Sequence, residues 1–176
     1  DNVFKELYGN RWKSIRVRSV ALVIAEIKQA LQERPTISFV NFHDDTFSSR
    51  SLEWLEEFVS RYKDEIKRPL MFRSIPGSMT EEKLNCLSQL RIISIGVGLQ
   101  SGSYNILKNI YKRPIKIKTF IKTIYKLHAR KITPIIDVML NNPYEKNRIW
   151  LKQLKPFRCC QNPLSLNFMG SHFTPG

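Results

Sequence analysis

The chain has 176 residues, of which 42% are hydrophobic and 25% are charged, a balance typical of one globular domain with a buried core. Its formal net charge of +14 favours an anionic substrate or partner. No uncharged apolar run reaches the ~18 residues that a transmembrane helix needs, and the first residues are not those of a signal peptide.

The three cysteines, Cys86, Cys159 and Cys160, have neither CxxC nor Cys/His metal-site spacing. The adjacent pair is more typical of buried thiols than of a disulfide or of metal ligands. We therefore predict a reducing, cytoplasmic environment, no membrane partner and no structural disulfides.

The basic residues are concentrated in the second part of the sequence. Residues 104–176 hold 14 basic and 2 acidic residues, whereas the first 103 hold 15 and 13. An anionic partner such as RNA would suit this half. A solvated lysine face is the favoured interpretation, because the lysines of one predicted helix spread around it without interleaved aromatic residues. These are Lys116, Lys118, Lys122 and Lys126.

After an irregular, basic segment over residues 1–18, helix and strand patterns alternate to the end of the sequence. Ser19 caps a first helix, which has a 3.6-residue apolar period and ends at Pro35. Further helices are expected after Ser51, after Thr80, from Ser103 to Arg113, over 116–131 and around 150–154. Strands are expected at 36–42, 70–75, 91–97, 133–140 and 164–169. This alternation implies parallel strands joined by right-handed crossovers, and so an α/β fold that looks like a segment of a barrel.

Polar side chains follow the predicted strands at the points where they end. They are Asp44 and Asp45, Arg73, Gln100 and Ser101, Asp137 with Asn141 and Asn142, and Ser171 with His172. Because a parallel barrel gathers its strand ends into one mouth, these side chains are predicted to line one rim. Three glycines, at 96, 98 and 102, let the backbone bend there and let another group approach it closely.

Asp137 lies inside the apolar run Ile135–Leu140, where an unpaired buried charge would cost several kcal/mol. It should therefore face the mouth and meet a hydrogen-bond donor. A ribose hydroxyl pair would suit it. The alternative is a buried carboxylate paired with a neighbouring lysine or a backbone amide.

The carboxylates of Asp44 and Asp45 have four interpretations. They could act as a general acid and base, ligate a metal together with His43, hold the ammonium group of a ligand, or cap the next helix. The sequence leaves all four open.

Four segments carry a further signal: His43–Phe47, Ile95–Ser103, Asp137–Glu145 and the terminal Thr174-Pro-Gly. In this order they resemble the radical S-adenosylmethionine (SAM) enzymes, most closely the subgroup that often carries an N-terminal cobalamin-binding domain. The resemblance implies a partial TIM-type (β/α)6 barrel, with about five of its six parallel strands present here. In that family SAM chelates one iron of a [4Fe-4S] cluster. Its reductive cleavage, with an electron from a donor such as ferredoxin or flavodoxin, gives a 5′-deoxyadenosyl radical that attacks a substrate.

The resemblance also implies roles at the methionine end of SAM. Asp44 and Asp45 would bind the amino group, since an ammonium is stabilised by carboxylates. Arg113 would bind the carboxylate, for which a guanidinium is the best-matched donor.

Toward the nucleoside, the resemblance assigns Gln100 and Ser101 to the ribose or the methionine moiety. Asp137 and Asn142 would lie near the ribose and the adenine. Cobalamin is a further cofactor that the subgroup implies for the parent protein.

The sequence departs from the family in one respect: it contains no CxxxCxxC loop to ligate the cluster. We therefore predict that residues 1–176 are one fragment of a radical SAM core domain, without the first strand, the cluster loop and the C-terminal extension, and inactive by itself. One alternative is a degenerate, non-catalytic barrel that binds an anionic partner such as RNA. Another is a metal-dependent hydrolase that uses His43, Asp44, Asp45, Asp137 and His172.

Overall fold

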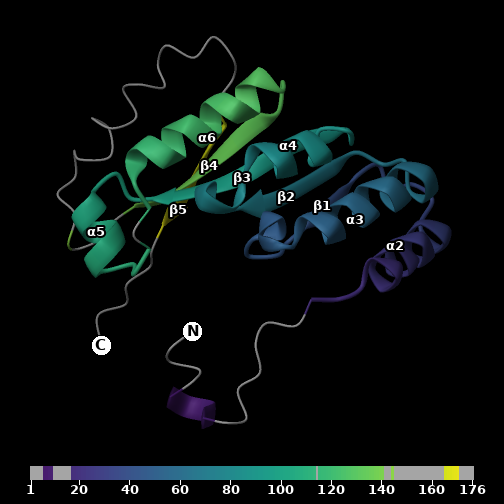
Figure 1. The fold of residues 1–176 in the computed structure, drawn as a ribbon, viewed down its shortest axis with the longest axis horizontal. Coiled ribbons are helices and arrows are strands. Elements are labelled where there is room, and N and C mark those ends of the chain that lie inside the picture. The colour runs from purple at the N-terminus through teal and green to yellow at the C-terminus, as the bar shows by residue number, and fades with distance from the viewer. Residues whose placement is uncertain (1–5, 10–16, 114, 141–143, 145–164, 171–176) are drawn as a thin grey trace.

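A computed structural model of the chain describes residues 6–9, 17–113, 115–140, 144 and 165–170. Its sheet has five parallel strands in chain order, and helices connect the first four (Figure 1). The strands are β1 (Val40–Phe42), β2 (Leu70–Ser74), β3 (Ile92–Gln100), β4 (Thr133–Leu140) and β5 (Ser165–Gly170). The helices are α2 (Val20–Glu33), α3 (Leu52–Glu65), α4 (Glu81–Leu87), α5 (Tyr104–Asn109) and α6 (Ile117–Ala129), with short 3-10 helices η2 (Phe47–Ser49) and η3 (Pro76–Ser78).

The predicted α/β fold with parallel strands is confirmed, and the sheet has the strand order of a partial barrel. Two strand boundaries differ from the sequence prediction by more than one residue. β1 begins at Val40, because its neighbour β2 begins at Leu70 and offers no earlier ladder partner. β3 continues to Gln100, because β4 pairs with it as far as that residue. The helix expected around 150–154 lies outside the described residues.

The two faces of the sheet have different roles. Strands in chain order with right-handed crossovers place their helices on one face, and there Ile95, Val97 and Leu99 of β3 are buried in the core. The alternate positions of β3 point to the opposite face, the inner face of the partial barrel. Two of these alternate positions are glycines, Gly96 and Gly98.

The turn after β1 is held by a cluster of aromatic rings. Phe47 is fully buried, and its ring centroid lies 4.9 Å from Phe42, 5.4 Å from Phe58 and 4.7 Å from Phe72. The ring of Trp54 adds an edge-on contact at 6.1 Å. Phe47 therefore fixes the loop that carries the acidic residues to β2 and α3.

Nowhere in the described part of the chain does a helix have the length and apolar character needed to cross a lipid bilayer.

Glu81 links α4 to α6. Its carboxylate forms ion pairs with Lys126 Nζ at 3.0 Å and Arg130 Nη2 at 2.6 Å. The hydrogen bonds from Lys126 and then Arg130 hold the pKa of Glu81 below its ordinary value. Because the folded-state pKa is lowered, this contact stabilises the fold above the unfolded pKa of about 4.3 and is lost as the pH falls through the folded-state value.

We expect the Glu81→Gln variant to lose less stability than the wild type between pH 7 and pH 3. The variant has no carboxylate to protonate at this contact, so part of the acid sensitivity is removed. Urea denaturation at both pH values measures the difference. Glu82→Gln, one residue along the same helix turn, is the matched control and should keep the wild-type pH dependence. Identical pH dependence in Glu81→Gln and the wild type would contradict the assignment.

Candidate functional site

On the inner face of β3, Gly96 and Gly98 have no side chain, and side chains from nearby residues occupy the space over them. Arg73 of β2 is the register partner of Gly96. A Cβ built on Gly96 would lie 3.0 Å from Arg73 Cγ. The Arg73 side chain therefore lies across Gly96, toward the next strand.

Asp137 of β4 approaches from the other side. Its register partner is Gly98, and its Oδ2 lies 3.4 Å from Arg73 Nη1. The Asp137 side chain is 7% exposed, whereas that of Arg73 is 42% exposed. The prediction that Asp137 meets a donor is confirmed, and one such donor is an arginine two strands away. The pair is loose, because 3.4 Å is longer than a charge-assisted hydrogen bond.

Gln100 ends β3 in an unusual conformation. Its φ is +64°, and the N–H of Ser101 donates to the carbonyl of Leu99 at 2.8 Å, which closes a tight turn around it. The register of β3 against β4 shifts at this point, between Gly98 and Gln100. Residues held in such sparsely populated conformations are concentrated at functional sites.

The Gln100 side chain folds back over Gly98. A Cβ built on Gly98 would lie 2.7 Å from Gln100 Nε2 and 4.0 Å from Arg113 Nη1. Gln100 is 9% exposed, and its Oε1 is buried without a hydrogen-bond partner among the described residues. A buried amide oxygen without a partner is a cost to the fold, unless a ligand donates to it.

We call Arg73, Gln100, Arg113 and Asp137 the inner-face cluster. Arg113 is placed by the end of α5, where its N–H donates to the Leu107 carbonyl at 2.7 Å. Two guanidinium groups, one carboxylate and one amide thus lie near the two glycines on the inner face of β3. This set of groups can bind a carboxylate, hydroxyl groups or an ammonium in one small volume.

Ser101, predicted at the same strand end, organises the turn into α5. It is fully buried, and its Oγ accepts the N–H of Ser103 at 2.9 Å. Ser103 in turn caps α5, as predicted, by accepting from the N–H of Ile106. The Ser101 side chain thereby holds Gln100 and α5 in place.

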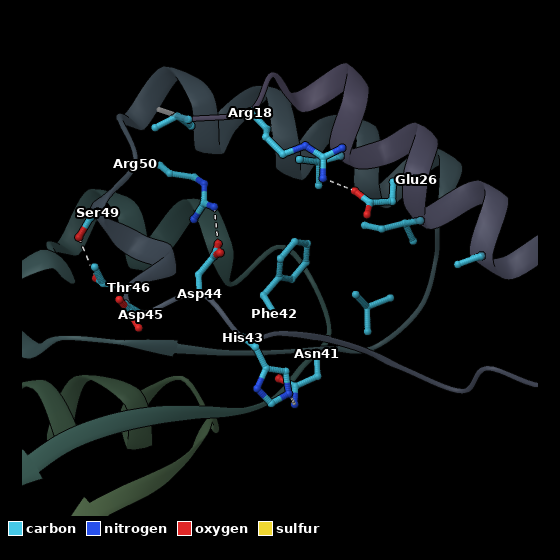
Figure 2. A pocket seen from close by; sticks show the side chains of 15 residues that line it. Arg18, Glu26, Asn41, Phe42, His43, Asp44, Asp45, Thr46, Ser49 and Arg50 are labelled. Carbon is cyan, nitrogen blue, oxygen red and sulfur yellow. Dashed lines mark hydrogen bonds and ion pairs between the residues drawn. The ribbon is translucent and has the colours of Figure 1, made fainter. Parts of the chain in front are cut away.

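Asp44 lies apart from the inner-face cluster. Its carboxylate forms an ion pair with Arg50, whose guanidinium sits 4.7 Å from the ring centroids of both Phe47 and Trp54. Figure 2 shows Asp44 turned toward Arg50, whereas His43 is turned toward Asn41. The His43 Nε2 lies 3.1 Å from Asn41 Nδ2.

Asp44 and Asp45 also line a cavity of about 770 Å³ between α2 and β1 (Figure 2). None of the inner-face cluster lines it, so the two sites are separate. The helix-cap interpretation of these aspartates is wrong, because the side chain that caps α3 is Ser51 and the residue before η2 is Thr46.

Residues 4–150 match the protein family described as the Radical SAM superfamily. The chain belongs to this superfamily. No curated protein sequence matches it significantly.

Several solved structures share the fold. TsrM, a radical SAM methyltransferase from Kitasatospora setae solved with cobalamin and a [4Fe-4S] cluster, has a TM-score of 0.68 at 17% identity over 87% of this chain and 31% of its own. TsrM with tryptophan substrate and the SAM analogue aza-SAM gives 0.69 at 17% identity, over 86% of this chain and 30% of its own. Elp3 from Methanocaldococcus infernus, with an N-terminal deletion, gives 0.62 at 16% identity over 86% and 42%. The present radical SAM chain therefore spans less than half of each of these structures.

Other predicted site residues of this radical SAM chain lie outside the described part. These are Asn141, Asn142, Ser171 and His172. No group of three or more potential metal ligands occurs among the described residues, so the hydrolase interpretation gains no support.

Of the two predictions for the glycines, close approach to the backbone is confirmed at Gly96 and Gly98, where the side chains of Arg73 and Gln100 use the space. Neither glycine bends the chain through a positive φ. No role was assigned to Arg73 from the sequence. A periodic signal was present, since Gly96 and Gly98 are two residues apart and so share one face of a strand.

Proposed function

We propose that this chain forms the SAM-binding part of a radical SAM enzyme. The observation that carries the proposal is the Gln100 amide, which lies over Gly98 near Arg113 and whose buried Oε1 has no hydrogen-bond partner among the described residues. A polar group in this state is stabilised when a ligand donates a hydrogen bond to it. Membership of the radical SAM superfamily supports SAM as that ligand.

The inner-face cluster matches the functional groups of SAM. Arg113 would bind the methionine carboxylate, for which a guanidinium offers paired donors. Gln100 Oε1 would accept from the ammonium or from a ribose hydroxyl, and Asp137 would accept from a second hydroxyl. Ser101 would position Gln100 through the turn. The contact of Asp45 and Asp44 with the SAM ammonium stays a prediction, and for Asp44 it would compete with the ion pair to Arg50.

The cysteines of this sequence do not fit a [4Fe-4S] cluster. Cys86 belongs to α4 and is buried in the core, and Cys159 and Cys160 are adjacent rather than spaced as CxxxCxxC. Our proposal for this chain is therefore the binding of SAM. Radical generation, a ferredoxin or flavodoxin electron donor, a substrate and cobalamin are proposed only for a radical SAM enzyme that supplies the cluster ligands. A reducing, cytoplasmic environment belongs to the same proposal.

We expect Arg113→Met to weaken the binding of SAM about tenfold, the size of effect that follows from losing one charge-assisted contact. Equilibrium dialysis of the 176-residue chain with radiolabelled SAM measures it. 5′-Methylthioadenosine, which lacks the methionine carboxylate, should bind both proteins equally. Lys112→Met removes the same charge one residue away and is the control.

Equal SAM binding by Arg113→Met and the wild type would remove Arg113 from the site. Failure of the wild-type chain to bind SAM at all would contradict the proposed function.

A further inference from the structure

The surface of α5 and α6 has a charge pattern that the SAM site does not use. Residues 104–131 contain nine basic residues and no acidic one. These residues comprise α5, the connection after it and α6 (Figure 1). A surface of one sign over two consecutive helices attracts an anionic partner.

The exposed side of α6 is a defined row of side chains. The helix buries Phe120, Thr123, Ile124 and Leu127 against the sheet. Lys118, Lys122 and Tyr125, spaced at i, i+4 and i+7, therefore lie together on the exposed side. Tyr125 is 51% exposed, so its ring is available to a partner.

The remaining cations of α6 are engaged elsewhere. Lys126 and Arg130 form ion pairs with Glu81 of α4. Lys118 and Lys122 have no acidic partner among the described residues within salt-bridge distance. Two lysine charges without an acidic partner among the described residues thus lie in one row with an exposed aromatic ring.

α5 repeats the arrangement. Tyr104 is 42% exposed, and Lys108, four residues later on the same side of the helix, is exposed as well. No aromatic residues were expected among the lysines of this region, whereas Tyr104 and Tyr125 each share an exposed row with lysines.

We propose that this α5–α6 surface binds single-stranded nucleic acid. Lysines neutralise the phosphates, and exposed aromatic rings stack on unpaired bases. An acidic protein would use the charge but would leave the tyrosines without a function. The proposal concerns the outer, helical side of the sheet and does not depend on SAM binding at the inner face.

The test is fluorescence anisotropy of the 176-residue chain with a fluorescein-labelled 20-residue oligouridylate at several salt concentrations. Lys118→Ala/Lys122→Ala should weaken binding about tenfold and reduce the slope of log K against log salt by about 1.4, two phosphate contacts at about 0.7 each. Tyr125→Ala should weaken binding at least about fivefold without changing this slope. Tyr125→Phe, which keeps the ring, should bind like the wild type.

The matched control is Lys63→Ala/Arg91→Ala, which removes two exposed charges from α3 and from the loop before β3. If this control weakens binding as much as Lys118→Ala/Lys122→Ala, bulk charge alone attracts the RNA and the proposal is overturned. Equal binding of a 20-base-pair RNA duplex, or competition by polyglutamate as strong as by oligouridylate, would overturn it too. Oligothymidylate distinguishes DNA from RNA as the ligand. If it binds as tightly as oligouridylate, the surface accepts either nucleic acid; if it binds more weakly, the surface prefers RNA. Circular dichroism of each variant verifies the fold, and Tyr125→Phe against Tyr125→Ala keeps the test valid if the lysine variant unfolds.

Discussion

Replacement of Phe47 by alanine is expected to lower the free energy of unfolding by about 3–5 kcal/mol. Phe47 is fully buried and touches four other rings, from β1, α3 and β2. Alanine would leave a cavity among rings that belong to three different elements, so a local shift cannot fill it. The variant should also release Arg50, whose guanidinium lies 4.7 Å from the Phe47 ring.

Urea denaturation monitored by circular dichroism measures the loss. Phe39→Ala is the matched control, because Phe39 is 44% exposed and lies just before β1. Its removal is expected to cost less than about 1 kcal/mol. If the two variants lost the same stability, the ring cluster would not be what holds the turn after β1.

The helix starts could be predicted because they are encoded locally. A cap was expected at Ser19 and helix starts at Ser51, Thr80 and Ser103, and in each case the side-chain oxygen accepts a backbone N–H of the first turn. α6 has no such side-chain cap. Its start followed instead from the apolar period of the helix, which depends only on the spacing of its own residues.

The inner-face cluster could be predicted only in part. The rim position of Gln100 and Asp137 followed from the rule that parallel strand ends meet. The contact between Arg73 and Asp137 did not follow from the sequence. It depends on the register of β2, β3 and β4, and on the space over β3 that its two glycines leave free of side chains. The ion pair of Asp44 with Arg50 was missed for a similar reason, since it depends on how η2 packs against Trp54.

Gly98→Val is expected to weaken SAM binding about 100-fold, as if two hydrogen bonds of about 1.4 kcal/mol each were lost. A Cβ at this position would lie 2.7 Å from Gln100 Nε2, so the Gln100 amide must leave its place. The added methyl groups would also occupy the space between Gln100 and Arg113. Stability should change little, because the displaced atom is the end of a flexible side chain and valine suits a strand.

Equilibrium dialysis with SAM and urea denaturation together separate the two effects. Gly77→Val is the control, since a Cβ on Gly77 would have no neighbour within 4 Å, and it should retain wild-type affinity. Gln100→Ala provides the second comparison: it removes the same amide without adding bulk, and it should lose part of the affinity that Gly98→Val loses. If Gly98→Val bound SAM normally while Arg113→Met did not, the ligand would lie at the end of α5 rather than over β3. Because Gly98→Val acts on the strand under the Gln100 amide and Arg113→Met acts after α5, their relative effects locate SAM within the inner-face cluster.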